Sequence, residues 1–90
     1  MAHLSRDKSK ILARVRRLKG QLEAVERAIE ADSECGAILH LVAAVRGAAS
    51  SLTAELLEEH LLHHVTEVED ASARRRGAEE LVTAFRTYMK

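Results

Sequence analysis

The chain has no proline and no tryptophan, and it has only one phenylalanine and one tyrosine among its 90 residues. A proline-free chain rich in Ala, Leu, Glu and Arg has the composition of an all-α protein. Ninety residues make one small domain, 1–90, near the size at which a lone hydrophobic core is marginal. We therefore expect oligomerisation to supply additional buried surface.

Other absences exclude whole classes of function. A single cysteine, Cys35, cannot form an internal disulfide, which favours a reducing cytoplasm. The N-terminus lacks the apolar core of a signal peptide and no stretch approaches a membrane span, so we expect no membrane partner. Glycine-rich phosphate loops and an oxyanion hole are missing, and so thin a chain offers no enclosed substrate pocket. We therefore expect the protein not to be an enzyme.

The net charge of zero hides a strong segregation of charge along the chain. Residues 1–20 contain seven Lys/Arg against one Asp, whereas residues 31–70 contain one Arg against eight acids. Residues 71–90 are basic again, with five Lys/Arg against two Glu. A basic N-terminal helix joined to an acidic centre predicts an anionic partner for the basic end.

Hydrophobic periodicity predicts three helices. The first runs from about Ser5 to Ala31, with an apolar seam that steps by four and three: Ile11, Val15, Leu18, Leu22, Val25 and Ile29. Asp32-Ser33-Glu34 then breaks the pattern and supplies an N-cap for a second helix to about Val65. The second helix is long for so small a domain, which favours a partner chain to cover it.

A polar, acidic segment from Thr66 to Ala71 predicts a loop before the third helix. Ser72 is a possible N-cap for that helix, which could also begin only after Gly77 because glycine is a poor helix former. One face of this helix is apolar and includes Leu81 and Phe85.

Cys35, His60 and His64 have side chains and spacing suited to a metal ion. His60 and His64 are four residues apart, so on a helix their imidazoles share one face. Cys35 lies 25 residues before His60, which is about 37 Å along a helix at ~1.5 Å per residue. One shared site therefore requires an antiparallel second subunit. His63 is an alternative to His64, and His40 is a candidate ligand or an ordinary surface histidine.

Several blocks along the whole chain resemble the CsoR/RcnR family of bacterial transcriptional repressors. They are Arg14-Val-Arg-Arg-Leu-Lys-Gly-Gln-Leu-Glu-Ala-Val-Glu, Glu34-Cys35, Ala43-Ala-Val-Arg-Gly-Ala and Glu59-His60-Leu. The resemblance implies a three-helix protomer that forms antiparallel dimers and, from these, a homotetramer. It also implies binding to double-stranded operator DNA in the effector-free state and release when the effector binds.

The residue types at four positions indicate which branch of that family the chain resembles. His3, Cys35, His60 and His64 are similar to the nickel/cobalt branch, whose effector is Ni(II) or Co(II), with Zn(II) as an alternative. Copper sensors of the family have a second cysteine where this chain has His64, which argues against Cu(I). Formaldehyde sensors have an N-terminal proline where this chain has Ala2, and persulfide sensors need two cysteines.

The resemblance places DNA binding on basic residues of the first helix and of the Ala-Val-Arg-Gly block, here Lys10, Arg14, Arg17 and Arg46. These are residue types that contact phosphates. The sequence thus predicts a cytoplasmic, metal-responsive repressor of a nickel/cobalt efflux gene. Two alternatives stay open: a formaldehyde-responsive repressor that uses Cys35 and the N-terminal amine, and a helical metal carrier or adaptor that does not bind DNA.

Overall fold

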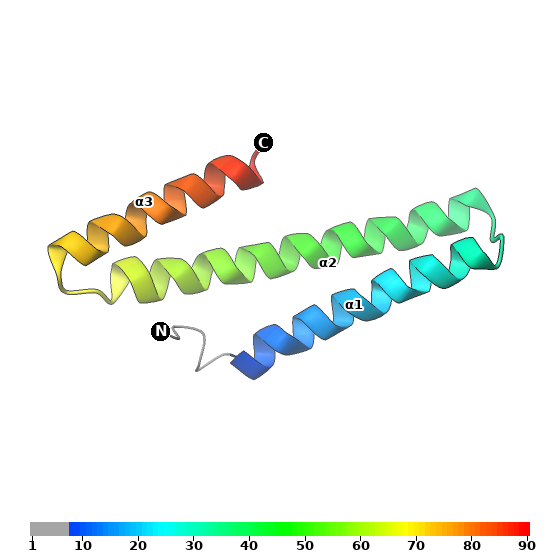
Figure 1. Ribbon diagram of the computed structural model, residues 1–90, viewed down its shortest axis with the longest axis horizontal. Helices are drawn as coiled ribbons and strands as arrows, with labels where there is room; N and C mark the ends of the chain where they lie inside the picture. The colour runs from blue at the N-terminus through cyan, green and yellow to red at the C-terminus, as the bar shows by residue number, and fades with distance from the viewer. Residues whose placement is uncertain (1–7) are drawn as a thin grey trace. The chain divides into compact units, whose positions relative to one another are not determined.

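The computed structural model describes residues 8–90, and within them it has no strands, so the all-α prediction is confirmed (Figure 1). The elements are α1 (Lys8–Glu30), α2 (Cys35–Leu61), the π-helical segment η1 (Leu62–Thr66) and α3 (Ala71–Tyr88). The predicted start of the first helix at Ser5 lies outside the described residues. The predicted end of the second helix near Val65 falls within η1, which continues α2.

The turn between α1 and α2 has a defined helix-ending geometry. Asp32 has a φ of 55°, in the left-handed region that ends many helices. Its N–H donates to Ile29 O at 3.1 Å, and the N–H of Ser33 donates to Ala28 O at 2.9 Å, which is the Schellman pattern. The carbonyl of Glu34 then accepts from Ile38 N at 3.1 Å and begins α2. The predicted break therefore lies where the sequence placed it.

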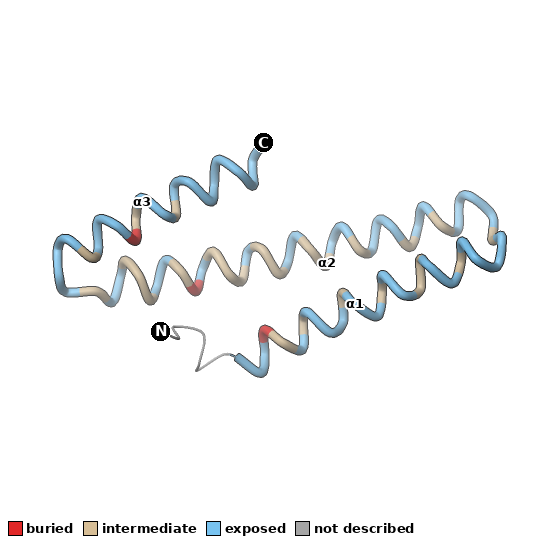
Figure 2. Tube along the Cα trace, viewed as in Figure 1, coloured by how far each residue is buried: buried red, intermediate tan, exposed pale blue. Residues whose placement is uncertain are grey.

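Residues 8–53 form an antiparallel pair of helices, α1 and the first part of α2 (Figure 1). The apolar seam of α1 divides into two columns that each repeat every seven residues. Ile11 is buried and the positions after it, Leu18 and Val25, are half-buried, whereas the other column is exposed: Val15, Leu22 and Ile29. Most of the described chain is exposed or only half-buried (Figure 2). The side chains of the exposed column can pack against another apolar surface.

Residues 54–90 contain the end of α2, η1 and α3, and η1 packs against α3. The third helix begins at Ala71, so the predicted cap at Ser72 and the alternative start after Gly77 are both wrong. Asp70 is the cap, because its Oδ2 accepts from Ala73 N at 2.8 Å. Arg74 Nη1 donates to the carbonyls of Val68 and Glu69, at 3.1 and 3.2 Å, and closes the loop before α3.

One helix of the described chain, Cys35–Thr66, is long and apolar enough to cross a membrane by length and composition alone, because it contains an 18-residue window with a mean hydropathy of 1.4. The prediction that no stretch approaches a membrane span is therefore wrong for composition, although the core helix of a soluble protein passes the same test. In the isolated chain none of this window is buried, so it also presents apolar surface to a partner.

Candidate functional site

His60 and His64 lie side by side where α2 continues into η1. Their ring centroids are 4.6 Å apart and the ring planes meet at 23°, so the two imidazoles are stacked. The backbone here is π-helical: Glu67 N donates to Leu62 O at 2.9 Å, a bond that spans five residues. Single π-helical turns are often found at functional sites. The predicted pairing of these two histidines on one helix face is present in the structure.

The His60 ring is held by residues of α3. Its Nε2 lies 2.9 Å from the carbonyl oxygen of Gly77 and 3.6 Å from Oε1 of Glu80. A carbonyl oxygen can only accept, so Nε2 carries the proton and donates. In the neutral ring the lone pair is then on Nδ1, the nitrogen through which His60 would bind a metal ion. The two α3 contacts thus select one tautomer of His60.

His63 has a different environment from its neighbours. Its Nε2 lies 3.0 Å from Oε2 of Glu59, and its Nδ1 lies 3.2 Å from Oε1 of Glu67. Both ring nitrogens therefore face carboxylates, one of them on a side chain that is only 6% exposed. Because His64, and not His63, is stacked on His60, the geometry favours His64 as the partner of His60.

The other candidate metal ligands are not gathered with these histidines in one chain. Cys35 is the first residue of α2 and is an exposed free thiol, and His40 is exposed on the same helix. His3 lies outside the described residues. Within residues 8–90 no three His, Cys, Asp or Glu side chains come together as a metal site. A metal site built on His60 and His64 would therefore need a third donor from outside this part of one chain.

The donor types fit a borderline metal ion. Imidazole suits Zn, Cu, Fe and Ni, and thiolate adds a softer donor, whereas a hard ion such as Mg²⁺ prefers oxygen ligands. His60 and His64 would supply two nitrogens and Cys35 a sulfur. The predicted set of four ligands also includes His3, and it stays a prediction.

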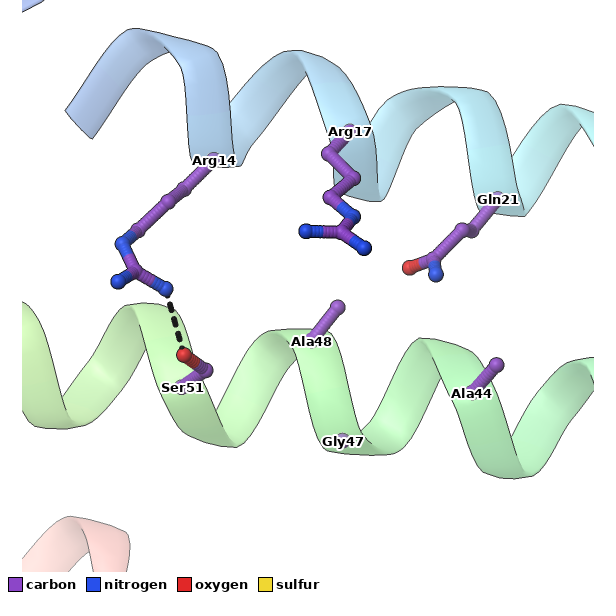
Figure 3. Close-up of a pocket in the computed structure, with 7 residues that line it drawn as sticks. All are labelled: Arg14, Arg17, Gln21, Ala44, Gly47, Ala48 and Ser51. Atoms are coloured by element: carbon purple, nitrogen blue, oxygen red, sulfur yellow. Dashed lines mark hydrogen bonds between the residues drawn. The ribbon is translucent and has the colours of Figure 1, made fainter. Parts of the chain in front are cut away.

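Two of the four predicted DNA-binding residues line one pocket between α1 and α2 (Figure 3). The pocket has a volume of about 200 Å³ and is lined by Arg14, Arg17, Gln21, Ala44, Gly47, Ala48 and Ser51. Both guanidinium groups extend from α1 toward α2, and Arg14 Nη1 donates to Ser51 Oγ at 2.7 Å (Figure 3). Small side chains on α2 leave room for these long ones. Two cations around one pocket make an anion-attracting surface.

The other two predicted residues, Lys10 and Arg46, are exposed. Lys10 precedes Arg14 by one turn of α1, and Arg46 adjoins Gly47 on α2. Sequence reasoning missed the contacts that Gly77 and Glu80 make with His60. A signal existed for Gly77, a glycine within the third helix, but the pattern there also predicts a possible helix start.

Paired imidazoles in residues 54–90 and a basic pocket in residues 8–53 are the two candidate sites within residues 8–90.

Comparison with known proteins identifies the family. The chain matches the family described as metal-sensitive transcriptional repressor over residues 7–87. It is 50% identical over 92 residues to an uncharacterized protein in the bioA 5' region of Serratia marcescens, with all of both chains covered. The transcriptional repressor RcnR of Salmonella paratyphi B is 32% identical over 90 residues, again covering all of both chains.

A solved structure is also similar. It is a variant of the formaldehyde-responsive regulator FrmR from Salmonella enterica serovar Typhimurium, with a TM-score of 0.86 and 44% identity, covering 92% of this chain and 94% of that one. The chain therefore belongs to the metal-sensitive transcriptional repressors of the CsoR/RcnR type. It is a transcriptional regulator and not an enzyme, which agrees with the prediction.

Proposed function

We propose that the protein represses transcription by binding operator DNA in its metal-free form and that Ni(II) or Co(II) releases it. In this proposal it acts in the cytoplasm as a homotetramer built from antiparallel dimers, with residues 1–90 as a single domain, and the regulated gene encodes metal efflux. Membership of a family of transcriptional repressors disfavours the alternative of a metal carrier or adaptor.

The observation that carries the proposal is the stacked pair of His60 and His64, with the tautomer of His60 set by α3. Cys35 of a second subunit would supply a thiolate and His3 a third imidazole. Backbone or terminal-amine nitrogens would complete the six-coordination that favours Ni(II) and Co(II) over Zn(II). The absence of a second cysteine argues against Cu(I) as the effector.

DNA binding is assigned to Lys10, Arg14, Arg17 and Arg46, which would neutralise backbone phosphates. If metal weakens DNA binding, DNA must weaken metal binding by the same factor, commonly about 1–3 kcal/mol of coupling. Cys35 and His60 are on the same helix as Arg46 and Ser51, so α2 is the element through which the two sites would be coupled.

A second candidate function is a formaldehyde-responsive repressor. The observation in its favour is the similarity to FrmR, at 44% identity, together with the exposed thiol of Cys35. In that function Cys35 and the N-terminal amine would bind the effector. Ala2 stands at the position where formaldehyde sensors of the family are expected to have proline, which argues against it.

One experiment tests both functions. Purified metal-free protein should bind its operator DNA, and addition of Ni(II) or Co(II) should release it, whereas formaldehyde should not. Co(II) should also give a thiolate-to-metal charge-transfer band that Cys35→Ala abolishes. His40→Ala is the matched control and should leave both band and affinity unchanged. Release by formaldehyde and not by metal would establish the second function instead, and an unchanged Co(II) spectrum in Cys35→Ala would refute the site.

A further inference from the structure

Gly77 lies where α3 packs against η1. It is buried, and a Cβ added to it would overlap the carbonyl oxygen of His64 and lie 2.8 Å from the carbonyl carbon. No other glycine of α1 or α2 is so placed, since at Gly20, Gly36 and Gly47 an added Cβ meets nothing within 4 Å. The two atoms nearest to the added Cβ are backbone atoms of His64, which cannot turn aside as the end of a flexible side chain would.

The same residue also contacts the other histidine of the pair. The carbonyl oxygen of Gly77 accepts the hydrogen bond from Nε2 of His60 at 2.9 Å. Gly77 thus contacts both histidines. Its carbonyl oxygen holds the ring of His60, and its lack of a side chain leaves room for the backbone of His64. The contact with His64 brings α3 closer to η1 than a residue with a Cβ would permit, and the hydrogen bond to His60 is made by the same residue of α3.

A helix-interior glycine needs a compensating reason. Relative to alanine it costs the helix about 1 kcal/mol. Gly77 is within α3, six residues after its first residue, so it neither caps nor ends the helix. The close approach to His64 is the packing reason for glycine at this position.

We propose that Gly77 is a positioning residue for the metal-binding histidines, holding His60 and His64 in the orientation that a metal ion requires. The proposal rests on the proposed metal-sensing function. A side chain at position 77 would separate α3 from η1, break the hydrogen bond to His60 and displace the backbone of His64. Residues that hydrogen-bond to a metal-binding histidine commonly contribute ~10–100-fold to metal affinity.

The first test needs no metal. Imidazole ¹⁵N–¹H NMR spectra of the metal-free protein, at a pH where the rings are neutral, report the tautomer and hydrogen bonding of each histidine. In the natural protein His60 should carry its proton on Nε2. Gly77→Ala should shift the ring signals of His60 and His64 and leave that of exposed His40 in place. The matched control Gly20→Ala, the same exchange in open space on α1, should change none of them.

The outcomes separate clearly. A His60 ring protonated on Nδ1 in the natural protein would overturn the proposal, because Gly77 O can only accept. This measurement decides the matter even if Gly77→Ala does not fold. Unchanged His60 and His64 signals in a folded Gly77→Ala variant would overturn it as well.

The second test is a Co(II) titration of the same variants. Gly77→Ala should bind Co(II) about 10- to 100-fold more weakly, with an altered absorption spectrum, while Gly20→Ala matches the natural protein. Equal affinity and an identical spectrum in Gly77→Ala would contradict the proposal. If the natural protein itself bound no Co(II), the proposed metal function would fail, whereas the NMR result would still show whether Gly77 orients the histidines.

Discussion

Adjacent histidines in η1 have different surroundings because of the side chains one turn away. His63 lies between Glu59 and Glu67, each four residues distant, and both of its ring nitrogens face carboxylates. His64 is stacked on His60 instead. A shift of one residue along the helix thus distinguishes His63, which is held by carboxylates, from His64, which is a candidate ligand.

This difference predicts a contrast between two matched variants. His64→Gln should lose Co(II) affinity by more than the ~10–100-fold typical of a residue that only orients a ligand. His63→Gln should retain its Co(II) affinity, because the ring of His63 is not a ligand in this proposal. The glutamine amide can donate a hydrogen bond to the buried carboxylate of Glu59. Isothermal titration of both variants with Co(II) measures the contrast. A larger loss in His63→Gln than in His64→Gln would show that His63 is the ligand.

At the scale of elements, α1 combines two surfaces. One is the exposed apolar column that includes Leu22, and the other is the basic surface that includes Arg14 and Arg17. Arg14 donates to Ser51 of α2, so the hydroxyl of α2 limits where the guanidinium of α1 can lie. An ordered cation loses less entropy on meeting a phosphate than a fully mobile one.

We expect Arg14→Ala to weaken operator binding and to reduce the slope of log affinity against log salt by about one unit. The reason is that one fewer phosphate is neutralised on binding. Fluorescence anisotropy over a series of salt concentrations gives both quantities. Arg27→Ala removes a cation from the last turn of the same helix, outside the predicted DNA-binding set, and should leave the slope unchanged. An unaltered slope in Arg14→Ala would remove this residue from the DNA interface.

At the scale of the whole molecule, one chain buries very little. Ile11 is the only buried hydrophobic residue within residues 8–90, whereas Leu22 is 52% exposed and Ile29 is 56% exposed. Each such side chain contributes about 1.5–3 kcal/mol when it is fully removed from water. An isolated chain of this size therefore lacks the core that it needs, and a second copy with the same apolar column is the partner that the family implies.

Leu22→Glu should therefore dissociate the proposed homotetramer. The substitution places a carboxylate in the exposed apolar column, where each copy in a symmetric interface would bury it without a partner. Sedimentation velocity measures the assembly directly. Ala13→Glu adds the same charge at an exposed position of α1 outside the seam and should leave the assembly intact. A Leu22→Glu protein that remains the size of the natural one would show that this column is not an interface.

The sequence by itself determined the features that depend on neighbours along the chain. The three helices and the break at Asp32 follow from periodicity and local backbone preferences, and the pairing of His60 with His64 follows from a spacing of four residues. The seam of α1 was likewise predictable, although its division into a covered and an exposed column was not.

Only the tertiary structure decided how α3 meets η1. The contact of Gly77 with His64 and the hydrogen bond from His60 to Gly77 both join residues that are distant in sequence. Glycine in a helical pattern is ambiguous, since a helix end and a close packing contact both favour it. The packing of η1 against α3 resolves that ambiguity, because the backbone of His64 occupies the space that a Cβ at position 77 would need.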